Sequence, residues 1–147
     1  MKRILKSGIL LAIITLALTS CCKDKPDDGT LSPPSWILGE WEWSYEDDLQ
    51  YICRNYKFTS NDLISSSTHE RDDMVHSGTV VLVFSEINKS PHISVKETKK
   101  TDNIYEVTVS TRYAGTEEDA VYSFKKGDGT YIEEDTGNGN YTRLDKK

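Results

Sequence analysis

The stretch IYEVTVSTRY, from Ile104 to Tyr113, decides the fold of this chain. Alternate side chains, beginning with Tyr105, Val107 and Val109, are apolar or aromatic, and those between them are polar or charged. A period of two residues is typical of a β-strand that has one buried and one solvated face. The stretch therefore predicts a half-buried strand.

Similar short runs recur every 8 to 12 residues on both sides of this stretch, separated by turn residues, and helix signals are almost absent. The expected strands are 40–45, 51–58, 63–69, 77–86, 92–99, 104–113, 119–126, 130–134 and 140–144. Gly-rich turns at 127–129 and 137–139 are hairpin signals. We therefore predict an all-β fold, a small antiparallel up-and-down β-barrel of about 8–9 strands, because barrel closure removes exposed sheet edges.

One of these runs, Thr79 to Phe84, is apolar on both faces. This composition is typical of a strand covered on both sides, so we expect it to be the best-covered strand of the sheet. Elsewhere aromatic residues supply much of the expected inward surface. They include Trp41, Trp43, Tyr45, Tyr56, Phe58, Tyr105, Tyr122 and Phe124.

The first 20 residues have the composition of a secretory signal peptide: a basic start, an apolar run from Ile9 to Leu18, and small residues before Cys21. The apolar run is too short for a bilayer, which needs roughly 20 residues. Residues 21–35 are rich in charged residues, Pro, Gly and Ser, and predict a flexible linker. The barrel domain is expected over residues 36–147.

The four residues Leu18-Thr19-Ser20-Cys21 resemble the lipobox of bacterial lipoproteins. That resemblance implies that Cys21 is lipidated and anchors the chain to the outer membrane of the cell envelope. The acidic residues that follow are loosely similar to the export signal of surface lipoproteins of the Bacteroidetes. Both the periplasmic face and the cell surface therefore remain open as locations.

The formal net charge is −6, and it falls to −9 once the signal with its three basic residues is removed. A chain this acidic repels nucleic acid and anionic membrane surfaces. We therefore expect no nucleic-acid partner, and membrane attachment through the lipid alone.

Gly39-Glu40-Trp41, at the start of the first expected strand, resembles the Gly-x-Trp signature of the lipocalin superfamily. Arg143, in the last strand, falls where those barrels place an arginine over that tryptophan. The resemblance implies that the first and last strands pair and that Gly39, Trp41 and Arg143 close the barrel. A guanidinium stacked on an indole contributes about 0.5 to 2 kcal/mol.

Arg54 lies among apolar inward residues, where a cation is costly unless it is paired. It could bind the carboxylate or phosphate of an apolar ligand, pair with a core acid, or lie near water at a strand end. The candidate ligand-binding residues are Arg54, Tyr56, Trp43, Tyr105 and Tyr122. A barrel of this size can either fill its interior with side chains or enclose one small ligand, and both alternatives are open.

Other chemistry finds little support in the sequence. The histidines His69, His76 and His92 lack metal-ligand spacing, so no zinc site is expected. The acidic clusters, Glu133-Glu134-Asp135 among them, are interpreted as solvated turn residues. We expect no catalytic residue and no cofactor, and hence no enzyme. Cys53 either pairs with Cys22 or remains a buried free thiol.

Two hypotheses of function follow. The first is a lipid-anchored envelope lipoprotein whose lipocalin-like barrel binds a small apolar or amphipathic ligand. The alternative is a ligand-free protein-interaction module, such as an envelope inhibitor, immunity protein or accessory protein, whose acidic surface would suit a basic protein partner.

Overall fold

The computed structural model describes residues 30–71 and 78–147. The proposed signal, Cys21, Cys22 and His76 lie outside the described residues. Within the described ranges, no helix combines the length and the apolar character that a membrane span requires.

The described residues form nine β-strands, one turn of 3-10 helix and one turn of α-helix. In chain order these are η1 (Ser35–Ile37), β1 (Gly39–Glu46), β2 (Gln50–Phe58), β3 (Leu63–Arg71), β4 (Gly78–Val83), α1 (Phe84–Ile87), β5 (Ile93–Lys100), β6 (Ile104–Tyr113), β7 (Thr116–Lys126), β8 (Tyr131–Gly137) and β9 (Asn140–Lys146). Every strand pairing is antiparallel. The prediction of a small all-β, barrel-like fold is confirmed.

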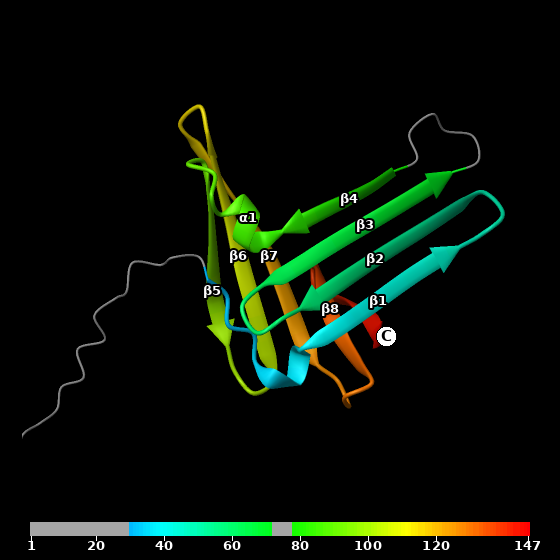
Figure 1. Ribbon diagram of the computed structural model, residues 1–147. Coiled ribbons are helices and arrows are strands. Elements are labelled where there is room, and N and C mark those ends of the chain that lie inside the picture. The colour runs from blue at the N-terminus through cyan, green and yellow to red at the C-terminus, as the bar shows by residue number, and fades with distance from the viewer. Residues whose placement is uncertain (1–29, 72–77) are drawn as a thin grey trace, which may run out of the picture.

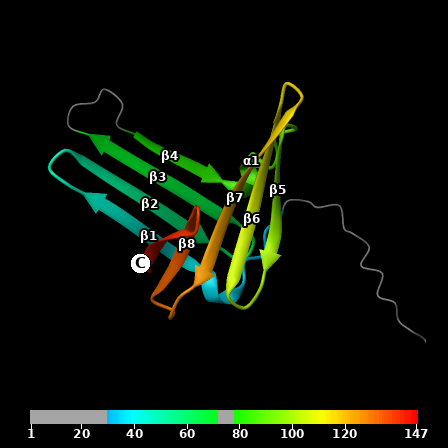
Figure 2. The same cartoon turned by 180° about the vertical axis from the view of Figure 1, so that it is seen from behind.

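The strand order is β4-β3-β2-β1-β9-β8-β7-β6-β5, which is an up-and-down meander joined through β1 and β9. In Figures 1 and 2 the sheet curls into a half-barrel, with β1–β4 as one layer and the later strands folded across one end of it. Two register pairs join β1 to β9, whereas eight join β1 to β2. Because the pairing of β1 with β9 is short, the two layers diverge beyond it (Figure 1). Strands β4 and β5 remain the two edges of the sheet.

The first and last strands pair as the lipocalin resemblance implies, but the arginine is not where it was expected. Trp41 is fully buried, and its Nε1 donates a 2.6 Å hydrogen bond to the carbonyl oxygen of Ile37. Lys146 lies opposite Trp41, with its Nζ 5.4 Å from the indole centroid. Arg143 instead stacks on Tyr131 at 4.3 Å.

The physical reason is the two-residue period of a strand. Leu144 is buried in the core, so Lys146 lies on the inner face with it and Arg143 lies on the outer face. Gly39 does have a structural role at this joint. Its φ of +124° is a backbone conformation that favours glycine.

The core fills the closed end of the half-barrel with side chains from both layers. Its buried residues are Leu31, Ile37, Trp41, Tyr56, Phe58, Leu63, Phe84, Val95, Tyr105, Val107, Val109, Phe124, Ile132 and Leu144. The rings of Tyr56 and Phe58 each meet Phe124 edge to face, with centroids 5.0 Å apart. Such edge-to-face pairs stabilise a core beyond simple area burial.

The packed domain begins before residue 36. Leu31 is buried in the core, and the backbone N–H of Ser32 donates a 2.6 Å hydrogen bond to Glu97. The prediction of a flexible linker over residues 21–35 is therefore wrong at Leu31 and Ser32, which pack against the sheet. The composition there is polar overall, but one leucine suffices to hold the segment against the sheet.

The expectation that Thr79 to Phe84 would be the best-covered strand is also wrong. In β4, Val80 and Val81 are 63% and 56% exposed. Within the described residues β4 pairs with β3 alone, and it belongs to the part of the layer that extends beyond the core. Phe84 leaves the strand to begin α1 and is fully buried there.

Candidate ligand-binding site

The inner face of the β1–β4 layer continues past the core as an open concave surface. Residues directly opposite in antiparallel strands share a face. The register therefore places Trp43, Arg54, Ser67 and Val80 in one row across β1 to β4 on this surface. Three of the four can make polar or aromatic contacts with a ligand.

Glu134 of β8 links this row to the opposite layer. Its side chain is buried, and the residue is only 7% exposed. The hydroxyl of Tyr56 donates a 2.5 Å hydrogen bond to Oε1, and Nη1 of Arg54 lies 3.4 Å from Oε2. The carboxylate of Glu134 thus contacts two inward polar groups of β2, the Tyr56 hydroxyl and the Arg54 guanidinium.

The interpretation of Glu133-Glu134-Asp135 as solvated turn residues is therefore wrong for Glu134. The residue lies inside a strand, on the same face as the buried Ile132. That two-residue spacing from an apolar position is the sequence signal that could have identified Glu134 as inward.

Arg54 combines two of the alternatives that the sequence left open. It pairs with a core acid, yet its side chain is 42% exposed. Its guanidinium carbon lies 5.7 Å from the centroid of the Trp43 ring. The cation is thus held on the inner face by an acid and an indole, and part of it remains accessible to solvent.

Tyr122 of β7 lies on the inner face, two residues from the buried Phe124, whereas Tyr105 lies in the core. Burial, followed by the negative charge of Glu134, raises the pKa of Tyr122. Its ring meets Phe84 edge to face at 5.1 Å. Tyr105 is fully buried in the core, and its hydroxyl donates a 2.8 Å hydrogen bond to Glu97 on β5. The structure therefore places Tyr105 apart from the Arg54 cluster, with its hydroxyl directed to the β5 edge.

The buried phenols predict a loss of stability at alkaline pH. Burial raises the pKa of Tyr56 above its ordinary value of about 10, and the charge of Glu134 raises it further. Below pH 10 the phenol is protonated in both the folded and the unfolded chain, so its contribution is present in full. Above about pH 10 only the unfolded chain loses the proton, and the free energy of unfolding falls by up to about 1.4 kcal/mol per pH unit for each such phenol.

Urea denaturation at a series of pH values between about 9 and 11 measures this slope. Tyr56→Phe should make the decline shallower by close to the contribution of one phenol. Tyr105, whose pKa is raised by burial and by its hydrogen bond to Glu97, should account for part of the remainder. The same slope in the wild type and in Tyr56→Phe would contradict the assignment of Tyr56.

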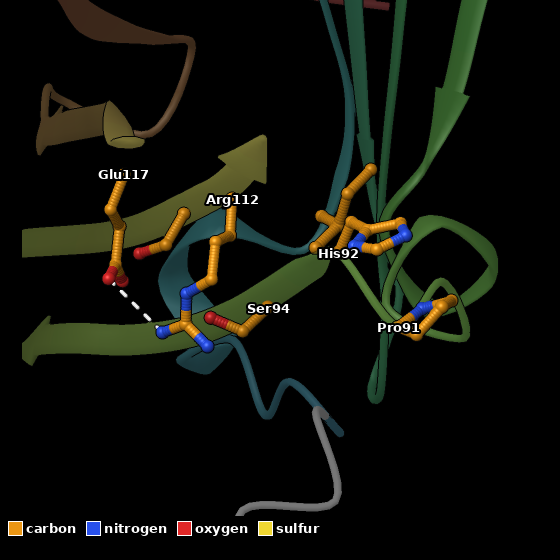
Figure 3. Close-up of a pocket in the computed structure, with 7 residues that line it drawn as sticks. Pro91, His92, Ser94, Arg112 and Glu117 are labelled. Atoms are coloured by element: carbon orange, nitrogen blue, oxygen red, sulfur yellow. Dashed lines mark hydrogen bonds and ion pairs between the residues drawn. The ribbon is translucent and has the colours of Figure 1, made fainter. Parts of the chain in front are cut away.

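A small hollow lies at the other end of the sheet, between β5 and the tip of the β6–β7 hairpin (Figure 3). Its volume is about 70 Å³, and its lining includes Pro91, His92, Ser94, Arg112 and Glu117. Pockets for small molecules are typically about 300–1,000 Å³. Arg112 and Glu117 form an exposed ion pair at 3.1 Å, which contributes little. The inner face around Arg54 is the better candidate site because its charged and aromatic side chains contact one another.

Among residues 30–71 and 78–147, no group of three or more His, Cys, Asp or Glu side chains could hold a metal ion. Cys53 is a half-buried free thiol opposite Ser44, on the outer face of the sheet. Its expected alternative partner, Cys22, lies outside the described residues.

Comparison of the chain with protein-family models, curated proteins and solved structures gives no match. The fold and the site therefore define the class on their own: an all-β half-barrel with an Arg–Glu–Tyr cluster on its concave face.

Proposed function

We propose that this protein is a binding module of the cell envelope, anchored by a lipid on Cys21, whose concave inner face takes a small amphipathic ligand. The observation that carries the proposal is the cluster around Arg54. A cation is held against Trp43 by a buried acid while 42% of its side chain stays exposed. Such a residue is preorganised to receive an anionic group.

The ligand class follows from the neighbours of Arg54. The Nη1–Oε2 distance of 3.4 Å to Glu134 is longer than the roughly 2.7–2.9 Å of a strong charge-assisted hydrogen bond, so Glu134 saturates only part of the guanidinium. Ser67, which lies opposite Arg54 on β3, offers a hydroxyl to the anionic group of the ligand. The half-buried Trp43 and the exposed Val80 offer apolar surface for a chain or ring. A molecule with an apolar body and a carboxylate or phosphate end fits this arrangement.

A lipid anchor is consistent with such a ligand. The acidic chain does not associate with anionic membranes through its own charge, so the lipid on Cys21 would hold it near a source of amphipathic molecules. The open side of the half-barrel would then give the ligand direct access to the site.

Dodecanoate is a suitable probe, with dodecanol as the matched probe that lacks the charge. Isothermal titration calorimetry of the protein should show dodecanoate binding that weakens about tenfold or more in Arg54→Ala, because a hydrogen bond to a charged group contributes about 1.5–3 kcal/mol. The weaker binding of dodecanol should not change.

Arg143→Ala is the matched control. It removes an arginine that also stacks on an aromatic ring, but on the outer face of the sheet. Dodecanoate affinity should be the same in this variant as in the wild type. Absence of dodecanoate binding, or an equal loss in both variants, would contradict the proposal and favour the alternative of a ligand-free module for a basic protein partner.

A further inference from the structure

The two edges of the sheet are built differently, and within residues 30–71 and 78–147 β4 is the edge that nothing covers. Its sequence, GTVVLV, contains no charged residue and no proline, and its register with β3 contains no bulge. Val80 and Val81 are 63% and 56% exposed. In both ribbon views β4 lies along the free side of the β1–β4 layer (Figures 1 and 2). Soluble proteins normally block such an edge with charge, proline or a bulge.

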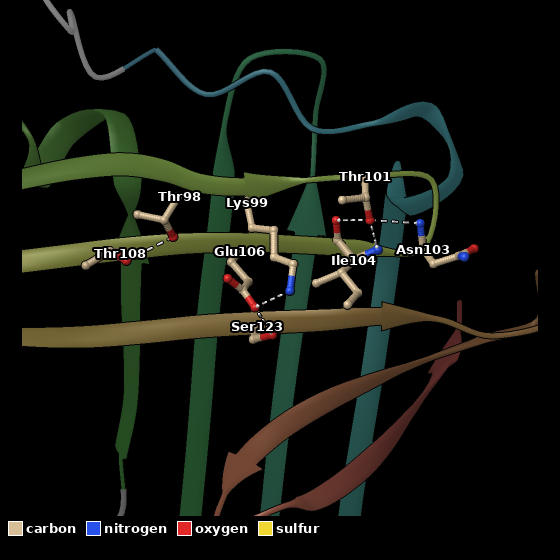
Figure 4. Close-up of polar contacts among 8 residues, drawn as sticks. All are labelled: Thr98, Lys99, Thr101, Asn103, Ile104, Glu106, Thr108 and Ser123. Carbon is tan, nitrogen blue, oxygen red and sulfur yellow. Dashed lines mark hydrogen bonds and ion pairs between the residues drawn. The ribbon is translucent and has the colours of Figure 1, made fainter.

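The β5 edge has several of these features. Its register with β6 shifts between Glu97 and Lys99, and lysines occupy both of its last two positions. Lys99 is held 3.8 Å from Glu106 on β6 (Figure 4). Ser32, from the segment before β1, accepts hydrogen bonds from Lys100 and donates to Glu97. In the part of the chain that the structure describes, β5 is therefore blocked and β4 is open, which favours a role for β4 in assembly.

We propose that β4 pairs antiparallel with β4 of a second copy of this chain, so that one sheet continues across a two-fold symmetric dimer. With Val81 on the symmetry axis, Val81 lies opposite its own counterpart. Val80 lies opposite Leu82 of the partner subunit, and Thr79 lies opposite Val83 of the partner subunit. Val80 and Leu82 share the inner face of the layer, so this register keeps like faces together.

The absence of charge on β4 favours a second copy of the same strand as its partner. The chain has a net charge of −6, so two copies can approach closely only through surfaces that carry no charge. Because β4 is uncharged, self-pairing places no like charges opposite one another. Each pair in the proposed register instead joins apolar or β-branched side chains. A charged peptide would find no opposite charge on β4 to bind.

The dimer follows from the edge alone and does not depend on the ligand proposal. It would join the inner faces of the two layers through Val80 and Leu82. In a two-fold symmetric dimer the same surface of each copy forms the interface. Both β4 edges would therefore be paired, and no free β4 edge would remain to extend the assembly into a fibre.

Sedimentation equilibrium of the full chain over a wide range of concentration tests the inference. The wild type should be a dimer, and Val81→Lys should raise the dimer dissociation constant by about tenfold or more, because it places two lysines opposite each other. The matched control is Val121→Lys. Val121 is also 56% exposed and lies on the outer face, but it pairs with Thr108 of β6, away from the β4 edge. This control should dimerise like the wild type.

A monomeric wild type at every concentration, or equal dimerisation of the two variants, would overturn the inference. Amide hydrogen exchange of the wild type provides a second test that needs no variant. The β4 amides should exchange more slowly at high than at low concentration, and the β5 amides should not change. Protection that is independent of concentration in β4, or that appears at β5 instead, would also overturn it.

Discussion

Trp41→Ala is expected to lower the free energy of unfolding by about 3–5 kcal/mol, the usual cost of truncating a large buried aromatic side chain. Trp41 is fully buried where the first and last strands meet, and its indole N–H is hydrogen-bonded to Ile37. The substitution removes the side chain that fills the short joint between β1 and β9. Equilibrium urea denaturation measures the change.

Trp43→Ala is the matched control for this prediction. Trp43 is two residues further along the same face of β1, but it is half-buried beside the partly exposed Arg54. Because less apolar area leaves water there, its truncation should cost less than half as much as that of Trp41. An equal loss of unfolding free energy in Trp41→Ala and Trp43→Ala would show that the core extends past Trp41 to include Trp43.

The local alternation of side chains was sufficient to predict most of the strands. The expected strand over residues 104–113 has those bounds in the structure, and the alternation of Trp41, Trp43 and Tyr45 gives the inner face of β1. These predictions succeed because a strand's two faces are set by a period of two residues, which is a local property.

Whether a strand is covered by other elements depends on residues far away in the sequence. The sequence pattern of the strand itself was therefore insufficient to predict it. The apolar run of β4 predicted the best-covered strand of the sheet, but the topology makes β4 an edge. Whether a valine is covered depends on which strand lies beside it, and the residues of β4 alone carry no information about that neighbour. The same reason explains Glu134, whose burial depends on Tyr56 and Arg54 from a strand about 80 positions earlier in the chain.

The candidate site was predictable in its aromatic and basic parts and not in its acid. Arg54, Tyr56 and Trp43 were identified from their inward positions, and the structure brings them together with Glu134. Glu134 was missed because acidic clusters near turns are usually solvated. Glu134 nevertheless links the two layers, because it lies on β8 and contacts Arg54 and Tyr56 on β2.

Glu134→Ala should therefore lower the free energy of unfolding by about 2–3 kcal/mol. The substitution leaves the buried hydroxyl of Tyr56 without its acceptor, and it leaves Arg54 without its acid. The cost attributed to Arg54 is kept small because its side chain is 42% exposed and water can solvate it. Urea denaturation of the variant measures the total.

Glu133→Ala is the matched control for Glu134→Ala. Glu133 is the adjacent residue of β8 and pairs on the outer face with Lys125 at 3.4 Å, where both side chains are partly exposed. Its loss should cost less than about 1 kcal/mol. A double-mutant cycle of Glu134→Ala with Tyr56→Phe should give a coupling of about 1–3 kcal/mol, because the two side chains share one buried hydrogen bond. A coupling near zero would show that Glu134 does not join the layers through Tyr56, and that the opening of the half-barrel is held by the surrounding core alone.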